Sequence, residues 1–409
     1  MKNLETLIQE LCPNGVEFVK LGDVGTFYGG LSGKSKADFT DGNAKFVTYM
    51  NVYSNPALNT DIKDFVKIEE GEKQNKVLYG DVLFTGSSET PNECGMTSVL
   101  TEKTEEDLYL NSFCFGYRFN DIDNVNPGFM KHLFRSHMLR KALAKTASGV
   151  TRFNVSKKKV ANIEIPLPPI EVQTEIVHIL DKFTSLEAEL EAELDCRKRQ
   201  YEYYRDKLLS FDNVGGQEVT ISKIGDIGRI CMCKRIMKNQ TNSESGIPFY
   251  KIGTFGKVAD AYISNDVYEE YKKLYSYPKK GDILMSASGT IGRTVVFNGK
   301  PSYFQDSNIV WVDNDETKVF NSYLNYYYQI IEWKTQGGTI KRLYNNLLAG
   351  ATIKYPSLEE QHRIVSILDR FESLTTSLQS GLPAEIAARR QQYEHYRDKL
   401  LTFKRKGAA

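Results

Sequence analysis

The chain has 409 residues, enough for two or three domains that each bury a separate hydrophobic core. Its 53 basic and 52 acidic residues nearly cancel, so no whole-chain basic excess exists and nucleic-acid binding must be argued from local clusters. Six scattered cysteines exclude a disulfide scaffold and predict buried or free thiols. With no secretory signal and no apolar run of membrane-spanning length, we expect a cytoplasmic protein without a membrane partner.

Residues 1–166 are predicted to form a mixed α/β domain. Strand patterns occur in LGDVGTFYGG (21–30), KFVTYMNV (45–52), GDVLFTG (80–86) and FCFGYRF (113–119), with glycine turns between them. Residues 129–148 have the apolar spacing of one helix, which ends at Gly149. Loop and strand then lead into the prolines of IPLPPIEVQ.

Residues 167–211 are predicted to form one long helix, because apolar residues recur at three-, four- or seven-residue steps between charged ones. The segment QTEIVHILDKF at 173 returns as QHRIVSILDRF at 361, an offset of 361 − 173 = 188. QYEYYRDKLLSF, ending at Phe211, returns as QYEHYRDKLLTF, ending at Phe403. Residues 355–409 are therefore a second copy of the helix, and the chain contains an internal duplication. The apolar stripe of each copy predicts a two-helix rod with its twin, although burial of one face in an ordinary helical bundle is the alternative.

Two local features modify the rod. Copy one carries two tandem EAEL units at 187–194, and copy two has a further leucine-type step through Leu374, Leu378, Leu382 and Ile386. One four-residue unit adds about 6 Å to a helix, so the unit count acts as a ruler if the rod is a spacer. Gly381-Leu382-Pro383 is expected to break or kink the second copy, with Pro383 at the start of a new segment.

Residues 212–354 repeat the order of the first domain. IPFYKIGTF (247–255), GDILMSASGTIGR (281–293), SNIVWV (307–312) and the helical pattern FNSYLNYYYQIIEWK (320–334) stand where similar patterns stood before. The aromatic stripe of that last segment is interpreted as core packing. The globular copies have diverged more than the helices, which favours two modules that recognise different things on one shared support.

No catalytic pattern emerges from the chain. SGKS at Ser32–Ser35 lacks a phosphate-binding loop's first glycine, because Tyr28 stands at that position. Glu332-Trp333-Lys334 with Asp313 upstream loosely fits a metal-dependent nuclease, but its counterpart in the first domain has no such triplet. A site-specific nuclease is therefore only the third hypothesis, which loss of Glu332 without loss of DNA cleavage would remove.

Polar and basic residues cluster instead on loops at matching places of both domains. Such side chains hydrogen-bond base edges and phosphates. The candidate DNA-binding residues are Lys34, Lys36, Tyr49, Asn51, Ser87, Ser88, Thr151, Arg152, Asn154 and Lys157 in the first domain, and Lys251, Thr254, Ser286, Ser288, Lys341, Arg342 and Asn345 in the second.

The repeated QTEIVHILDKF and QYEYYRDKLL blocks, the EAEL units and the IPLPPIEVQ entry resemble the specificity subunits of type I restriction–modification enzymes. The resemblance covers essentially the whole chain. It implies an α+β fold of two target-recognition domains joined by two long antiparallel helices with pseudo-two-fold symmetry. Each domain would recognise one half of a split, asymmetric double-stranded DNA target, and the helices would set the gap between the halves.

The resemblance also implies partners. Two methyltransferase subunits would dock on the helices, and restriction subunits would join through them. S-adenosylmethionine, ATP and Mg²⁺ are then expected on those partners, with no cofactor on this non-catalytic chain. The alternative function is a free-standing two-headed DNA-binding or scaffold protein without a methyltransferase.

Overall fold

The computed structural model describes residues 4–211, 218–338, 341–376 and 381–407. The chain forms two compact units. Unit 1 comprises Met1–Glu191 and Glu385–Ala409, and unit 2 comprises Ala192–Ala384. Each unit therefore joins one globular domain to part of each helix copy.

Unit 1 is built on mostly antiparallel sheets, with β3 and β9 as a parallel pair, and the first four-stranded sheet has the strand order β2-β10-β6-β8. The central strand β10 pairs antiparallel with both β2 and β6, and all four residues of β6 are buried. A second four-stranded sheet has the order β4-β3-β9-β5, and the small sheets are β11-β12-β7 and β1-β13. The strands are β1 (Phe18–Lys20), β2 (Gly25–Gly29), β3 (Ala44–Val47), β4 (Phe65–Val66), β5 (Lys76–Val77), β6 (Val82–Thr85), β7 (Ser87–Ser88), β8 (Thr97–Val99), β9 (Leu108–Leu110), β10 (Cys114–Phe119), β11 (Ala147–Ser148), β12 (Phe153–Val155) and β13 (Glu164–Pro166).

The shorter helices of unit 1 correct two predictions. KFVTYMNV is not one strand, because β3 ends at Val47 and the Thr48 hydroxyl then accepts a hydrogen bond from the Asn51 amide and caps a helix. The single helix predicted at 129–148 is two helices, because the Ser136 hydroxyl caps the second at the Leu139 amide. The helices are α1 (Leu4–Leu11), α2 (Leu21–Val24), α3 (Tyr49–Ser54), α4 (Pro127–Arg135), α5 (His137–Ala144) and α6 (Lys157–Val160), with 3-10 turns at η1 (Lys36–Phe39) and η2 (Pro91–Glu93).

Unit 2 repeats this topology, which confirms the duplication of the globular domains. The sheet β15-β22-β19-β20 corresponds to β2-β10-β6-β8, β16-β18-β17-β21 is the second four-stranded sheet, and β14 pairs with β23 as β1 pairs with β13. The strands are β14 (Thr220–Lys223), β15 (Gly228–Cys231), β16 (Thr241–Asn242), β17 (Ile247–Tyr250), β18 (Tyr262–Ile263), β19 (Ile283–Ser286), β20 (Thr294–Val296), β21 (Tyr303–Phe304), β22 (Ile309–Asn314) and β23 (Thr352–Tyr355). The shorter helical segments are η3 (Ile224–Asp226), η4 (Lys238–Gln240), α8 (Asn265–Leu274), α9 (Asn321–Tyr327) and α10 (Asn345–Gly350).

The aromatic segment 320–334 was predicted as one helix, which is wrong beyond Tyr327, where α9 ends. Its interpretation as core is confirmed, because Tyr323, Tyr326, Tyr327 and Tyr328 are buried and Trp333 packs against the same cluster. The predicted state of the cysteines is also confirmed. All six lie in described segments as free thiols, and five of them are buried.

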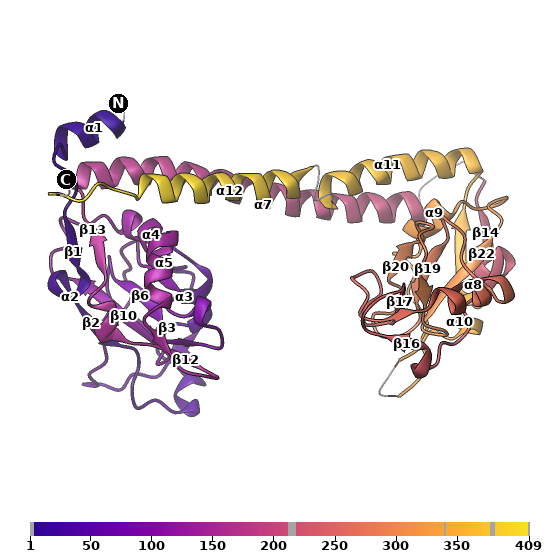
Figure 1. The fold of residues 1–409 in the computed structure, drawn as a ribbon, viewed down its shortest axis with the longest axis horizontal. Helices are drawn as coiled ribbons and strands as arrows, with labels where there is room; N and C mark the ends of the chain where they lie inside the picture. The colour runs from indigo at the N-terminus through magenta and orange to yellow at the C-terminus, as the bar shows by residue number, and fades with distance from the viewer. Residues whose placement is uncertain (1–3, 212–217, 339–340, 377–380, 408–409) are drawn as a thin grey trace. The chain divides into compact units, whose positions relative to one another are not determined.

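The first long helix is confirmed as α7, a continuous helix of 41 residues from Ile170 to Ser210 (Figure 1). In unit 1 its first part runs antiparallel to α12 (Leu382–Leu400). Phe183 stacks on Tyr396 with ring centroids 5.3 Å apart, and Arg390 forms ion pairs with Glu187 and Glu191.

The remainder of α7 runs antiparallel to α11 (Leu358–Thr376) in unit 2. There Tyr204 stacks on Phe371 at 5.7 Å. The predicted antiparallel pairing of the two repeat copies is therefore present within each unit. No helix in the described segments is both long and apolar enough to cross a bilayer.

The second repeat copy is two helices rather than one. Gly381 has a φ of +82°, and a Cβ there would lie 2.8 Å from the carbonyl oxygen of Ser373, so glycine is required at this close approach. Helix α12 begins at Leu382 with Pro383 as its second residue, which confirms the predicted break. Leu378 of the predicted stripe lies outside the described residues.

The apolar stripe packs against the globular domains as well as against its twin, so the expectation that the twin alone would cover it was incomplete: Tyr393 and Leu400 of α12 join the core cluster of unit 1. Ile176 and Leu180 are fully buried in the core of unit 1, whereas Leu186 is exposed. Ile364 and Leu368 are likewise in the core of unit 2, whereas Leu374 is exposed. Burial against a sheet domain removes more apolar surface from water than one facing helix can.

A buried glutamine fastens each domain to its helix. The Gln173 side chain accepts from the Asn126 amide at 2.8 Å and donates to the carbonyls of Asn124 and Pro168 at 3.0 and 2.8 Å. Gln361 makes the same three bonds in unit 2, at 2.9 to 3.0 Å, with Phe320, Lys318 and Pro356. Both side chains have no exposed surface.

Aspartates at equivalent helix positions add a second fastening. Asp181 bonds the imidazole Nε2 of His132 and the ammonium of Lys131, both at 2.7 Å. Partial burial by itself would raise the pKa of Asp181, but these two partners outweigh it and lower the pKa to about 2. In unit 2, Asp369 accepts from the Tyr326 hydroxyl at 2.5 Å.

Candidate nucleic-acid interface

Six of the predicted DNA-binding residues of unit 1 converge at the small sheet β11-β12-β7, namely Tyr49, Ser87, Ser88, Thr151, Arg152 and Asn154. Asn154 of β12 pairs with Ser87 of β7, although 67 residues separate them in the sequence. In Figure 1, β12 lies at the end of unit 1 that is remote from α7 and α12. The sheet therefore presents these loops away from the helices.

An open hollow of about 520 Å³ lies against this sheet. Its walls combine aromatic, hydroxyl and charged side chains, which suit the polar edge of a planar ligand. It is lined by Tyr49, Met50, Tyr53, Ser87, Ser88, Glu89, Glu93, Phe113, Thr151 and Arg152.

Arg152 is fixed at two points in this hollow. Its Nε donates to the Ser87 hydroxyl at 3.0 Å, and its guanidinium carbon lies 5.4 Å from the centroid of the Phe113 ring. Ser87 is buried, and its carbonyl also accepts a 2.8 Å hydrogen bond from the Tyr49 hydroxyl. A buried serine thus positions an arginine whose charged end remains exposed to solvent.

Glu93, on the acidic wall of the hollow, is ionised at neutral pH. Hydrogen bonds from the hydroxyls of Thr90 and Tyr53 lower the pKa of Glu93. The bond to Glu93 in turn raises the pKa of Tyr53, and burial raises that of Tyr49, so both phenols stay protonated. The two tyrosine rings stack with centroids 6.2 Å apart.

Unit 2 builds the same junction with different side chains. Ser288 forms a β-bridge with Arg342, as Ser87 pairs with Asn154. The Ala287 amide bonds the carbonyl of Asn308 where the Gly86 amide bonds that of Phe113. Asn308 therefore occupies in unit 2 the place that Phe113 occupies in unit 1, directly before the central strand.

The charged end of Arg342 is held by protein groups. One terminal nitrogen donates to the Ser307 carbonyl at 2.6 Å, to the Ser307 hydroxyl at 2.7 Å and to the Asn308 side chain at 3.1 Å. Ser288 also donates to the Asn308 side chain, at 2.9 Å. Each junction thus contains an arginine, but Arg342 stands at the position of Asn154 in unit 1, two residues after that of Arg152, and its surroundings differ.

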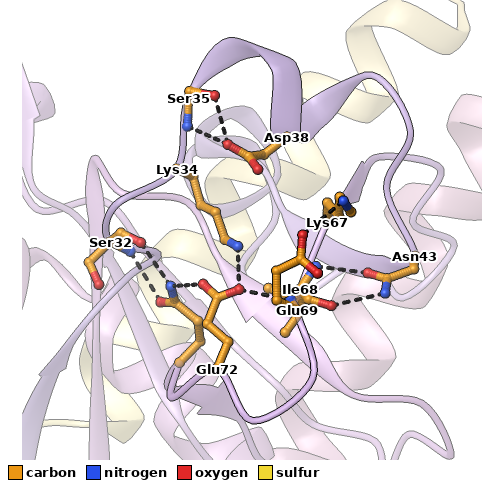
Figure 2. A network of polar contacts seen from close by, with 10 residues as sticks. Ser32, Lys34, Ser35, Asp38, Asn43, Lys67, Ile68, Glu69 and Glu72 are labelled. Carbon is orange, nitrogen blue, oxygen red and sulfur yellow. Dashed lines mark hydrogen bonds and ion pairs between the residues drawn. The ribbon is translucent and has the colours of Figure 1, made fainter.

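Several candidate residues have structural partners instead of a free polar group. Figure 2 shows Lys34 with its ammonium 2.5 Å from Glu72, and its side chain is only 7% exposed. Hydrogen bonds from Gln74 and Lys34 lower the pKa of Glu72 to about 2, which keeps this carboxylate charged. Because its charge is already paired, Lys34 is poorly placed to hold a phosphate.

The side-chain amide of Asn51 is similarly occupied. Its oxygen accepts hydrogen bonds from the Asn55 side chain and the Asn59 backbone N–H, and its nitrogen donates to the Asn59 carbonyl. In unit 2, buried Ser286 closes the turn 286–293 through the carbonyl of Thr290. These side chains build local structure in their own domains and have few polar groups left for DNA.

The other candidates divide into paired and exposed groups. Lys251 forms a 2.8 Å ion pair with Asp260, and the Thr254 hydroxyl bonds the Lys251 backbone. Lys36, Lys157 and Asn345 are exposed at the first residue of a short helical segment, and Lys341 is exposed beside the bridge residue Arg342. Phosphate contact is sterically open at these positions.

Sequence reasoning missed Tyr53, Phe113, Glu89 and Glu93 in unit 1 and Ser307 and Asn308 in unit 2. Phe113 was counted with a buried strand, yet it is 57% exposed. Its position directly before the central strand, matched by Asn308 in SNIVWV, was the available signal.

Among the residues that the structure describes, no cluster of His, Cys, Asp or Glu could hold a metal ion. Asp313, one member of the weak nuclease pattern, lies on β22 and is paired with Lys279 at 3.0 Å. The polar hollow and the matching junction of unit 2 are thus better candidates for recognition than for metal-dependent cleavage.

The profile of the type I restriction modification DNA specificity domain matches residues 13–195 and 216–388. A putative type I restriction enzyme specificity subunit of Haemophilus influenzae is 53% identical over 293 residues, which cover 69% of this chain and 74% of that protein. A type I restriction enzyme specificity subunit of Escherichia coli is 34% identical over 275 residues, covering 61% of this chain and 64% of that protein.

One solved structure, from a study of complex assembly and conformational transition of the type I restriction–modification system, aligns with a TM-score of 0.63. It covers 95% of this chain and 98% of that one at 20% identity. This likeness supports the fold described above.

Proposed function

The chain belongs to the family of type I restriction–modification DNA specificity subunits, and we propose that it recognises a bipartite, asymmetric double-stranded DNA target with one half assigned to each unit. The two specificity-domain matches fall on the two globular repeats. A non-catalytic role follows for this chain, as a recognition subunit of an adenine methyltransferase and restriction complex in the cytoplasm.

The observation that carries the proposal is the junction built twice with different chemistry. The serine and the residue before the central strand recur at equivalent places, as Ser87 and Phe113 and as Ser288 and Asn308. The arginines stand at different places, because Arg342 pairs with Ser288 where Asn154 pairs with Ser87, and Arg152 lies two residues before Asn154. A shared scaffold with exchanged side chains is what two readers of different DNA sequences require, because base edges are distinguished by the donors and acceptors opposite them.

The paired helices support the proposed partners. Each unit has exposed aromatic residues on α7 or α12, including Tyr203, Tyr204 and Tyr396. We assign to these helices the docking of two methyltransferase subunits, with restriction subunits attached through them. S-adenosylmethionine, ATP and Mg²⁺ would then be held by those partners.

Single-molecule sequencing for N6-methyladenine tests the proposal after co-expression of this chain with its cognate methyltransferase subunit. A split motif methylated on both strands, and absent without this chain, is the expected result. A stable complex that leaves the methylation pattern unchanged would contradict it and favour a scaffold role.

A further inference from the structure

We propose that Arg152 reads a guanine in the half-site bound by unit 1, and that Arg342 at the matching junction of unit 2 is a positioning residue rather than a base reader. This inference rests on the proposed DNA recognition. It assigns one base and one side chain within that function.

The first argument is the state of the guanidinium. Within the described chain, Nε of Arg152 donates a hydrogen bond to Ser87, and no hydrogen bond or ion pair reaches its two terminal nitrogens. Those two nitrogens carry four N–H donors in one plane. An arginine with both terminal nitrogens available can bond O6 and N7 of guanine together in the major groove.

The second argument is preorganisation. Ser87 and the Phe113 ring restrain Arg152 from two sides, at 3.0 Å from Nε and 5.4 Å from the guanidinium carbon. A side chain held before binding loses less rotamer freedom when it meets its ligand. Geometry held in this way favours a directional base contact over a diffuse charge interaction.

The third argument excludes a phosphate. Glu89 and Glu93 line the same hollow as Arg152, so the local charge is one cation against two carboxylates. A phosphate would be repelled by those carboxylates, whereas the major-groove edge of guanine is uncharged. A carboxylate in the hollow can also accept from N4 of the paired cytosine, which makes a G·C pair the best fit.

The contrast with unit 2 supplies the control. Arg342 spends one terminal nitrogen on three bonds to Ser307 and Asn308. Its guanidinium cannot present both terminal nitrogens to a base without breaking those bonds. Arg342 therefore orders the loop before β22 and does not select a base.

The test begins with the methylated motif of the wild-type chain co-expressed with its methyltransferase subunit. If no split motif is found, the proposed function fails and this inference fails with it. If a motif is found, the same sequencing is repeated for Arg152→Lys and Arg342→Lys. Lysine keeps the charge but cannot make the two-point contact, so a phosphate-binding residue would tolerate the change and a guanine reader would not.

We expect Arg152→Lys to relax one G·C position in one half of the motif, with discrimination reduced roughly 5- to 150-fold, while Arg342→Lys relaxes none. An unchanged motif, or an even loss of methylation at all sites, for Arg152→Lys overturns the inference and leaves the proposed function standing. Equal single-base relaxation by Arg342→Lys also overturns it, because the two arginines would then act alike.

A chemical substitution in the DNA locates the contact. Duplexes carrying 7-deazaguanine at the relaxed position lack the N7 acceptor. The wild-type complex should bind them at least fivefold more weakly than the normal duplex, and the Arg152→Lys complex should bind both about equally. Equal binding by the wild-type complex would overturn the assignment.

Discussion

Replacing Gln173 by methionine should loosen unit 1 while leaving unit 2 intact. Methionine approximates the shape of glutamine but cannot donate or accept in the same way. The change removes the bonds to the Asn126 amide and to the carbonyls of Asn124 and Pro168 at a fully buried site. Three backbone groups that join the start of α7 to the globular domain are then unsatisfied.

The magnitude follows from those three bonds. A buried partner left without its hydrogen bond costs about 1–3 kcal/mol, and partial relaxation reduces the sum, so we expect a loss of roughly 3–5 kcal/mol. At 1.4 kcal/mol for each factor of ten, the local opening equilibrium should rise about 100- to 4000-fold. This is large against the 5–15 kcal/mol that typically stabilises a domain.

Hydrogen exchange followed by mass spectrometry measures this change peptide by peptide, which suits a chain of two units better than one global unfolding transition. Peptides around 120–130 and 168–178 should lose protection in Gln173→Met. Gln361→Met should produce the same loss around 316–322 and 354–364 instead. Gln200→Met, at a partly exposed site of the same helix, is the control and should change local stability by less than about 0.5 kcal/mol.

An increase of less than tenfold in the opening equilibrium for Gln173→Met would refute the reasoning. So would a loss of protection spread evenly over both units. Either result would mean that the apolar contacts of Ile176 and Leu180 hold the domain to the helix without help from the glutamine.

Three further predictions concern the length of the helix pair, the stability of unit 1 at low pH, and Lys34. Inserting one further EAEL unit after Leu194 should widen the gap of the methylated motif by about one to two base pairs, since four helical residues add about 6 Å and DNA rises ~3.4 Å per pair. An unchanged gap in the methylated motif would contradict the hypothesis that the helix length sets the gap. Unit 1 should lose stability as the pH falls below about 6.5, because burial lowers the pKa of His132 and the unfolded chain then binds a proton more readily than the folded chain. The melting temperature of His132→Asn should therefore depend less on pH between 5 and 8 than that of the wild type. Equal pH dependence of the two melting temperatures would contradict this. Lys34→Ala should leave the methylated motif unchanged, because the lysine is paired with Glu72; a changed base in the motif would restore Lys34 as a DNA contact.

The sequence by itself determined the duplication, the long helices and the break at Gly381. These features can be read from local patterns and their repetition: helical periodicity, the Gly381-Leu382-Pro383 segment, and two similar blocks in register. Gln173 and Gln361 were visible as the first residues of those blocks, but their three shared hydrogen bonds were not, because each partner lies on a different segment.

Only the tertiary structure decided which polar loops act together. Arg152 meets Ser87 across 65 residues, and Lys34 meets Glu72 across 38, although both cations looked alike in the sequence. The difference arises because sheet pairing brings β7 beside β12, whereas a loop folds the Glu72 carboxylate over Lys34. Local pattern fixes which residues can form a strand or helix, but the packing of distant segments fixes which charges remain free to meet DNA.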